Sequence, residues 1–308
     1  MNSFFLKSIS TIGASLVLIN LSFAGSVTIN NLGTKTAGDL NNRFQNTPLH
    51  CNSNNKPGYY CSGIMIRTVD RYPEKDSYSW QAPTYALGNT IAFTYIRKDI
   101  TNASKSIWHV EDFGSGLIVN DENTALQKNT GYGVGCIFPT NAVSNERPHG
   151  CGDSSKKNDY TDYTDYSTCH LKGIYTDSDW YNKYVINGAV AEVNSCSFGA
   201  QDFLSFNHAI STQNLIHKNL SSDDEYKFMW NELPVTLDTW DQENPINNSI
   251  EAFWYNPNTD TSQGMGLVHA QKDQKEYYAL YHVNIPIVRL DTNSSNTPFS
   301  YFILDQGI

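Results

Sequence analysis

The sequence lacks the short motifs that identify the commonest secreted enzymes. It contains no G-x-S-x-G string of the serine hydrolases, no H-E-x-x-H string of the zinc proteases and no phosphate-binding P-loop. It also contains no C-x-x-C and no pair of histidines at the spacing of a zinc site. These absences give no support for a metal centre or a bound cofactor, and we expect neither.

Positive charge and long apolar runs are scarce as well. The chain has 21 Lys and Arg against 31 Asp and Glu, a net charge of −10, and an acidic surface repels the phosphates of nucleic acids. Beyond the first 24 residues, no apolar run reaches the roughly 18 residues that a transmembrane helix needs. Nucleic acid is therefore not an expected partner, and we expect no membrane span.

Residues 1–24 have the features of a secretory signal peptide. Lys7 follows a short polar start, an apolar run extends over residues 12–21, and Ser22 and Ala24 suit cleavage before Gly25. We expect the protein to be secreted, with retention in the periplasm as the alternative. Residues 25–308 have the length of one large domain or two small ones, and we expect a single domain because no long linker divides them.

All six cysteines lie beyond the signal peptide, and an even number in an oxidising compartment predicts disulfides. Pairing between sequence neighbours is the simplest arrangement, although other pairings stay open. It joins Cys51 with Cys61, Cys136 with Cys151, and Cys169 with Cys196.

The first half of the chain predicts a helix and several strands. A strand-like run at 27–32 precedes a helical pattern in which Ala37, Leu40 and Phe44 recur on one face. The branched runs at 63–70 and 89–99 predict two core strands. The run WHVEDFGSGLIVN predicts a further pair of strands around Gly114 and Gly116.

The middle of the chain predicts a loop-rich insertion followed by helices. Residues 129–170 are dense in Gly, Asn, Ser and Asp, and we expect the cysteines to hold this insertion. A helix is expected after Asp177 and Ser178, another over 198–217, and a third that runs to Glu232 before Pro234 stops it.

The C-terminal segment predicts a parallel crossover of strand, helix and strand. IEAFWY and NIPIVRLD are strand-like, and the stretch between them has an amphipathic helical pattern. The whole pattern predicts a single α+β domain with a mixed β-sheet, a C-terminal β-α-β crossover and the disulfide-tied insertion.

Cations and glutamates supply the candidate site residues. Arg67 lies on or at the end of one predicted strand and is followed by Arg71, and Arg97 and Lys98 lie at the end of the other. If these strands are neighbours, the four cations could converge as an anion site, because guanidinium groups bind phosphate oxygens as forks. The alternative is pairing of each Arg with a nearby surface carboxylate.

Three glutamates stand out by their context, although each is more typical of a solvated or capping carboxylate. They are Glu232, Glu251 and Glu276.

Several strings spread from about Leu40 to Leu290 resemble the halovibrin family of secreted bacterial proteins. They are DLNNRFQNT, PGYYCSGIMIR, IAFTYIRKD, MWNELPV with Trp240 downstream, IEAFWYN, and the final Q-x-x-YY with IPIVRLD. The resemblance implies NAD as substrate, in an ADP-ribosyltransferase or an NAD glycohydrolase.

The resemblance also implies roles for particular residues. Enzymes of the ADP-ribosyltransferase type use an Arg at the end of an early strand, a strand with Ser or Thr, and a late Glu, and Arg67, Thr94 and Glu232 occur in that order. Trp80 or Trp230 could stack on nicotinamide. Position 230 is Trp where transferases usually have Glu or Gln, so the resemblance favours water over a host protein as acceptor.

Two other classes of function fit the sequence. Exposed aromatic residues with paired acids would suit a secreted glycan hydrolase or glycan-binding protein. A disulfide-braced, non-enzymatic host-interaction module would use the loop region 129–170 as its binding surface and would place Arg67 and Glu232 far apart.

Overall fold

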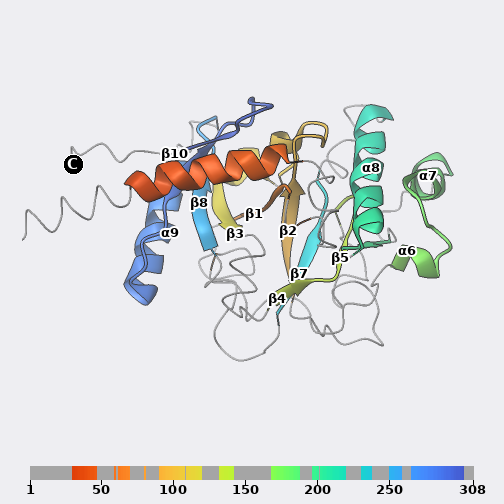
Figure 1. Cartoon of the computed structure of the whole chain (residues 1–308), viewed down its shortest axis with the longest axis horizontal. Helices are drawn as coiled ribbons and strands as arrows, with labels where there is room; N and C mark the ends of the chain where they lie inside the picture. Colours follow the sequence, from red (N-terminus) through yellow and green to blue (C-terminus); the bar gives the residue numbers. More distant parts are fainter. Residues whose placement is uncertain are drawn as a thin grey trace, which may run out of the picture.

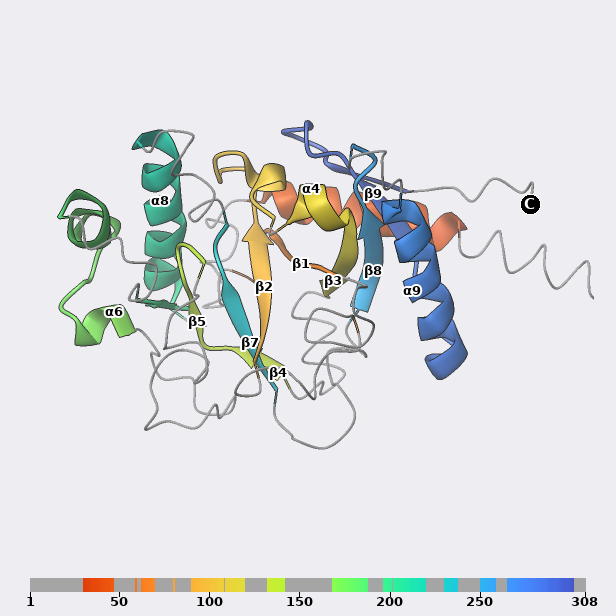
Figure 2. The same cartoon turned by 180° about the vertical axis from the view of Figure 1, so that it is seen from behind.

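The computed structural model describes the larger part of the chain (Figures 1 and 2). The described residues are 30–46, 59, 62–69, 80, 90–107, 109–119, 132–141, 168–187, 196–200, 202–219, 230–237, 250–258 and 265–301. The predicted signal peptide, Arg71, Cys51, Cys61, Cys151 and most of the insertion at 129–170 lie outside these residues.

The first helix covers residues 30–45 and confirms the helical pattern. Ala37, Leu40 and Phe44 are its buried face. The strand expected at 27–32 is wrong for residues 30–32, which begin this helix. Figures 1 and 2 show the helix crossing one face of the sheet.

The sheet has eight described strands in the order β10-β9-β8-β3-β1-β2-β7-β4. The bounds are β1 Ile64–Thr68, β2 Thr90–Ile96, β3 Ser115–Val119, β4 Tyr132–Val134, β7 Leu233–Leu237, β8 Ile250–Tyr255, β9 Ile287–Leu290 and β10 Phe299–Tyr301. The pair β8 and β9 is parallel and the other neighbours are antiparallel, so the sheet is mixed. The predicted α+β class is confirmed.

The predicted C-terminal crossover is present. β8 leads into α9 (Gly266–Tyr281), which leads into the parallel strand β9. Figures 1 and 2 show α9 on the face of the sheet opposite to the helix of residues 30–45. The sheet is therefore covered on both faces.

Two local predictions are corrected. The segment before Gly114 is a helical turn, α4 (Val110–Phe113), so only β3 remains of the expected strand pair. Glu232 is extended instead of helical, since it forms a β-bridge with Phe138 immediately before β7. Pro234 therefore lies inside the strand β7.

Two short strands and several helices lie near β7 and β4, at one end of the sheet: β5 (Cys136–Ile137), β6 (Phe198–Gly199), α6 (Thr168–Leu171), α7 (Asp177–Tyr181), η5 (Asn182–Ile186) and α8 (Phe203–Asn219). Thr176, and not Asp177 or Ser178, caps α7, through a capping box with Asp179. The bond between Cys169 and Cys196 ties α6 to the start of β6, and it joins two sequence neighbours as predicted. Cys136 is also disulfide-bonded.

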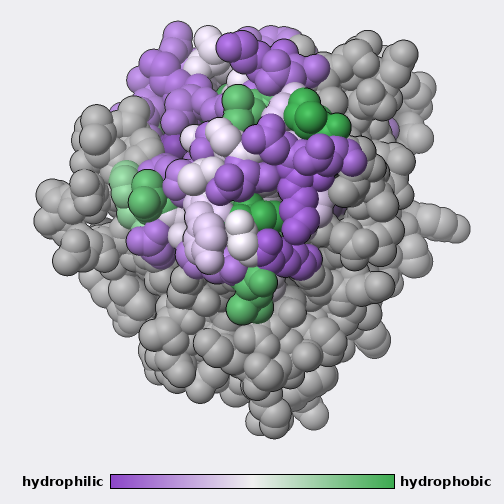
Figure 3. Space-filling model, turned by 90° about the vertical axis from the view of Figure 1, so that its right-hand side faces the viewer, coloured by the Kyte–Doolittle hydropathy of each residue, from purple (hydrophilic) through white to green (hydrophobic). Residues whose placement is uncertain are grey.

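The face formed by α6, α7 and α8 is mostly hydrophilic (Figure 3). Leu171, Ile186 and Leu204 are exposed on these elements, and the figure shows apolar spots separated by polar side chains. Among the described residues, no helix is long and apolar enough to cross a membrane.

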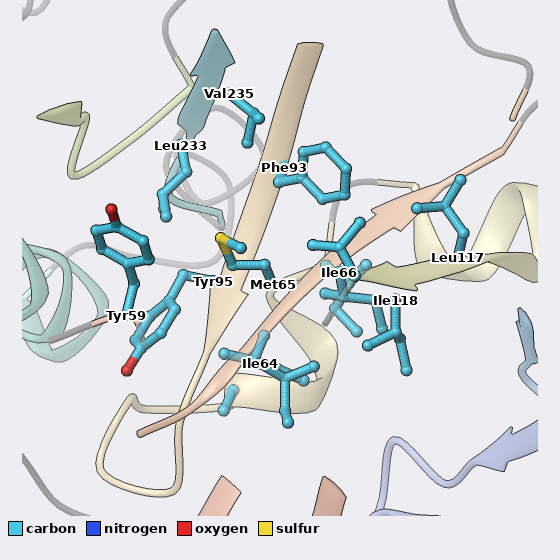
Figure 4. Packing of buried hydrophobic residues seen from close by; sticks show 14 of the residues in the cluster. Tyr59, Ile64, Met65, Ile66, Phe93, Tyr95, Leu117, Ile118, Leu233 and Val235 are labelled. Atoms are coloured by element: carbon cyan, nitrogen blue, oxygen red, sulfur yellow. The ribbon is translucent and has the colours of Figure 1, made fainter. Parts of the chain in front are cut away.

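The central strands carry the hydrophobic core (Figure 4). All five residues of β1 are buried, and Ile66, Tyr95 and Ile118 have no exposed surface. Tyr95 packs edge-on against Phe206 of α8, with ring centroids 5.0 Å apart. The core therefore fixes the positions of β1, β2 and β7 relative to one another.

Candidate functional site

The sheet opens between its two central strands. β1 pairs with β2 only from Ile64 opposite Ile96 to Ile66 opposite Thr94. Among the residues that the structure describes, β1 pairs beyond this point only with β3, and residues 90–93 of β2 pair only with β7. Figure 4 shows the two strands diverging. We call this opening between residues 66–68 and 90–94 the seam.

Arg67 lies at the seam. Its side chain is 8% exposed, and Nη1 donates a hydrogen bond of 2.7 Å to the carbonyl oxygen of Ala92 on the opposite strand. The guanidinium thus bonds to a β2 carbonyl for which the described part of the chain gives no partner strand on that side. The carbonyl oxygen of Arg67 in turn accepts a hydrogen bond of 3.2 Å from Nε1 of Trp254.

Thr94 and Glu232 lie opposite each other on neighbouring segments of the sheet. Phe93 pairs with Leu233, so the next position brings Thr94 opposite Glu232. The N–H and C=O of Glu232 both bond to Phe138 on the other side. This leaves positions 94 and 232 as a non-hydrogen-bonded pair, the arrangement in which cross-strand side chains are closest. Both side chains are buried, with 4% exposed.

Arg67, Thr94 and Glu232 therefore lie on three segments that are neighbours in the sheet, but their side chains do not all lie on one face of it. Side chains alternate along a strand, and Ile66 is the residue opposite Thr94. The stem of Arg67 accordingly leaves the sheet on the face opposite to Thr94 and Glu232. Its guanidinium reaches back to a main-chain carbonyl, which lies in the plane of the sheet at the seam.

Asn231 is a site residue that the sequence analysis missed. Its carboxamide accepts a hydrogen bond from the main-chain N–H of Tyr95 and donates one to the carbonyl oxygen of Tyr95, both at 2.8 Å. Nδ2 also donates to Oε1 of Gln213 on α8, at 2.8 Å. A polar residue between Trp230 and the apolar start of β7 was the available signal, because a buried amide needs partners.

The two candidate tryptophans lie in different surroundings. Trp230 is 6% exposed, and its ring centroid lies 6.1 Å from that of His109. Trp80 is 3% exposed and packs against Phe253 and Tyr277 beneath α9. Trp230 is two residues from Glu232, whereas Trp80 belongs to an aromatic cluster on β8 and α9.

The expected convergence of cations is wrong for the described residues. β1 and β2 are antiparallel, so Arg67 and Arg97 lie at opposite ends of the pair, roughly 14 Å apart along the strands. Arg97 is 2% exposed and bonds instead to Asp99, from Nε at 2.5 Å and from Nη2 at 2.9 Å. Arg97 is thus separated from the seam.

The other two glutamates are engaged elsewhere. Glu251 forms an ion pair of 2.5 Å with Arg43, which ties β8 to the first helix. Glu276 accepts a hydrogen bond of 3.3 Å from Nε1 of Trp80, so it faces the aromatic cluster instead of bulk solvent. Of the three glutamates, only Glu232 lies beside β2.

One cleft of about 370 Å³ lies away from the seam, between residues 98–104 and the turn at 292–295. It has no candidate catalytic residue in its lining. Within the described ranges, no group of His, Cys, Asp and Glu could hold a metal ion. No protein-family model matches the sequence, and no curated protein matches it.

Proposed function

We propose that the protein is an NAD glycohydrolase that cleaves the bond between nicotinamide and ribose. The proposal is supported by one observation above all: Arg67, Thr94 and Glu232 lie on consecutive segments of the sheet, at the place where β1 and β2 separate. The family resemblance implies an early Arg, a Ser or Thr on a strand and a late Glu in this order along the chain.

The chemistry requires few groups. The nicotinamide ring of NAD is cationic and leaves the ribose as a neutral molecule when it takes the electron pair of the broken bond, so no general acid is needed. The barrier lies in forming an oxocarbenium-like ribose. A carboxylate beside the ribose stabilises the developing positive charge most strongly in the transition state. Glu232 takes this role, because of the three glutamates it is the one that lies beside β2, opposite Thr94.

Thr94 and Arg67 take supporting roles. The hydroxyl of Thr94 lies across from Glu232 and can bond to its carboxylate or to a ribose hydroxyl. Arg67 binds the pyrophosphate through its guanidinium group. Trp230, two residues before Glu232 in the chain, offers a ring for stacking with nicotinamide, and water is the acceptor.

Glycan hydrolysis by the sequence-predicted acids has less support. Glycosidase carboxylates stand about 5 to 10 Å apart. Three strands separate β7 from β8, which puts Glu232 and Glu251 roughly 19 Å apart along the sheet. A host-interaction module in which Arg67 and Glu232 are far apart is also less favoured, because only β2 separates their segments.

Secretion is part of the proposal. The features of residues 1–24 and the Cys169–Cys196 disulfide support an oxidising compartment.

The direct test is incubation of the purified mature protein with NAD. We expect free nicotinamide and free ADP-ribose in equal amounts. ADP-ribose attached to an added host-protein extract would instead indicate a transferase. If NAD stays intact while oligosaccharides are cleaved in a parallel incubation, the proposal is wrong.

A further inference from the structure

The pairing between β2 and β7 continues past the point where the main chains stop pairing. The last main-chain pair is Phe93 with Leu233. Two positions on, the N–H and C=O of Tyr95 point to where the next main-chain partner would lie. The carboxamide of Asn231 occupies that place and forms both bonds, each 2.8 Å long. Asn231 thus does with its side chain what a peptide group does in a regular ladder.

In this position the carboxamide oxygen accepts one hydrogen bond and Nδ2 donates two. Its second Nδ2 hydrogen goes to Oε1 of Gln213, at 2.8 Å. Asn231, Gln213 and Tyr95 each have no exposed surface, so water cannot replace any of these bonds. Because an unpaired buried polar group is costly, the three bonds define one orientation of the Asn231 side chain.

This geometry has a consequence for the adjoining residue. Since its side chain makes these bonds, the main chain of Asn231 lies farther from β2 than a main chain that pairs directly. Glu232 follows directly, and its own N–H and C=O are bonded to Phe138 on the opposite side, at 3.0 and 2.8 Å. The main chain at Glu232 is therefore held from both sides.

We infer that Asn231 is a positioning residue that holds Glu232 opposite Thr94, and that Gln213 connects this restraint to α8. Asn231 acts through the main chain and has no contact with substrate in this role. The inference rests on the proposed function for its effect on catalysis. The geometric part, that Asn231 restrains the main chain at Glu232, is independent of the reaction.

The test replaces Asn231 with Ala and compares it with Phe206→Leu, which weakens the same contact between α8 and β2 without touching the carboxamide. For NAD cleavage we expect Asn231→Ala to lower kcat about 100-fold and to change KM less than threefold. Phe206→Leu should lose as much thermal stability and keep kcat within threefold. Equal losses of kcat in both variants would overturn the inference, since the effect would then be general destabilisation.

Two further measurements make the result specific. In the Glu232→Gln background, Asn231→Ala should reduce the remaining rate less than threefold, because residues that act through one group are not additive. A second full loss of about 100-fold would contradict the inference.

Amide hydrogen exchange does not depend on activity. It should be at least tenfold faster at Tyr95 and Glu232 in Asn231→Ala and unchanged at Phe93. Unchanged exchange at Glu232 would overturn the geometric part even if the wild-type protein leaves NAD intact. Absence of NAD cleavage by the wild type, with faster exchange in the variant, would reject the proposed function alone.

Discussion

Nη1 of Arg67 donates a 2.7 Å hydrogen bond to the carbonyl oxygen of Ala92, at the point where β1 and β2 no longer pair. A guanidinium presents its N–H donors in a planar fork that matches the oxygens of a phosphate. The same bond fixes the direction of the side chain. Arg67 can therefore be held at the seam before an anion arrives.

The first prediction concerns the fork geometry of Arg67. Lysine keeps the charge but cannot bind a pyrophosphate with two parallel N–H donors while also bonding to Ala92. We expect Arg67→Lys to raise KM for NAD about 10-fold to 100-fold in steady-state assays of nicotinamide release. Arg289→Lys on the exposed side of β9 is the control and should keep KM. Equal KM values in the two variants would remove Arg67 from substrate binding.

The second prediction concerns the glycine beside Arg67. Gly116 pairs with Thr68 on one side and Trp254 on the other, and an added Cβ would overlap the carbonyl oxygen of Arg67. We expect Gly116→Ala to lower the free energy of unfolding by about 1 to 3 kcal/mol, because the strands must move apart.

Gly38→Ala is the matched control for this change. Gly38 lies in the first helix, and an added Cβ there would meet no atom within 4 Å. Alanine in a helix interior should raise stability by roughly 0.5 to 1 kcal/mol. Urea denaturation followed by tryptophan fluorescence measures both variants, and a neutral Gly116→Ala would show that the strands are not closely packed there.

The third prediction concerns alkaline pH. Burial raises the pKa of Tyr277 to about 12, with a smaller contribution from Tyr281. The unfolded chain releases this proton near pH 10, before the folded chain does. The contribution of protonated Tyr277 to the free energy of unfolding is therefore fully present below pH 10 and is lost as the pH rises toward 12. Burial also raises the pKa of Tyr95, which acts in the same direction.

Tyr277→Phe should therefore make the loss of stability between pH 10 and 12 less steep. Tyr278→Phe, on the exposed side of the same helix, should leave the slope unchanged. Denaturant midpoints measured across this pH range test the difference, and identical slopes in the two variants would contradict it.

The fourth prediction concerns the disulfide between Cys169 and Cys196, which closes a loop of 27 residues. Replacing both cysteines with Ser should lower the free energy of unfolding by about 3 kcal/mol, since the unfolded chain gains conformational freedom. The site lies on other elements, so the variant should keep kcat at a temperature where it is folded. A loss of kcat in the folded variant would show that the disulfide also supports the seam.

Much of the fold follows from local patterns in the sequence. The recurrence of Ala37, Leu40 and Phe44 predicts the first helix, and the final strand-helix-strand pattern predicts the parallel pair β8 and β9. In these segments a single apolar face determines the structure, so periodicity is sufficient.

Features that depend on tertiary contacts could not be predicted in this way. The direction of β2 relative to β1 separates Arg67 from Arg97, and neither strand contains that information by itself. The carboxamide of Asn231 bonds to Tyr95, 136 residues away. Its role becomes visible only when β7 lies beside β2.

The central claim is that the Glu232 carboxylate stabilises the ribosyl cation during NAD cleavage. Its most direct test is kcat for nicotinamide release by Glu232→Gln, with Glu111→Gln on the exposed side of α4 as the control. Glutamine keeps the size of the side chain and removes the charge. We predict a fall in kcat of at least 1000-fold, about 4 kcal/mol, with the folded structure retained and the control unaffected. A folded Glu232→Gln protein that keeps wild-type kcat would contradict the claim.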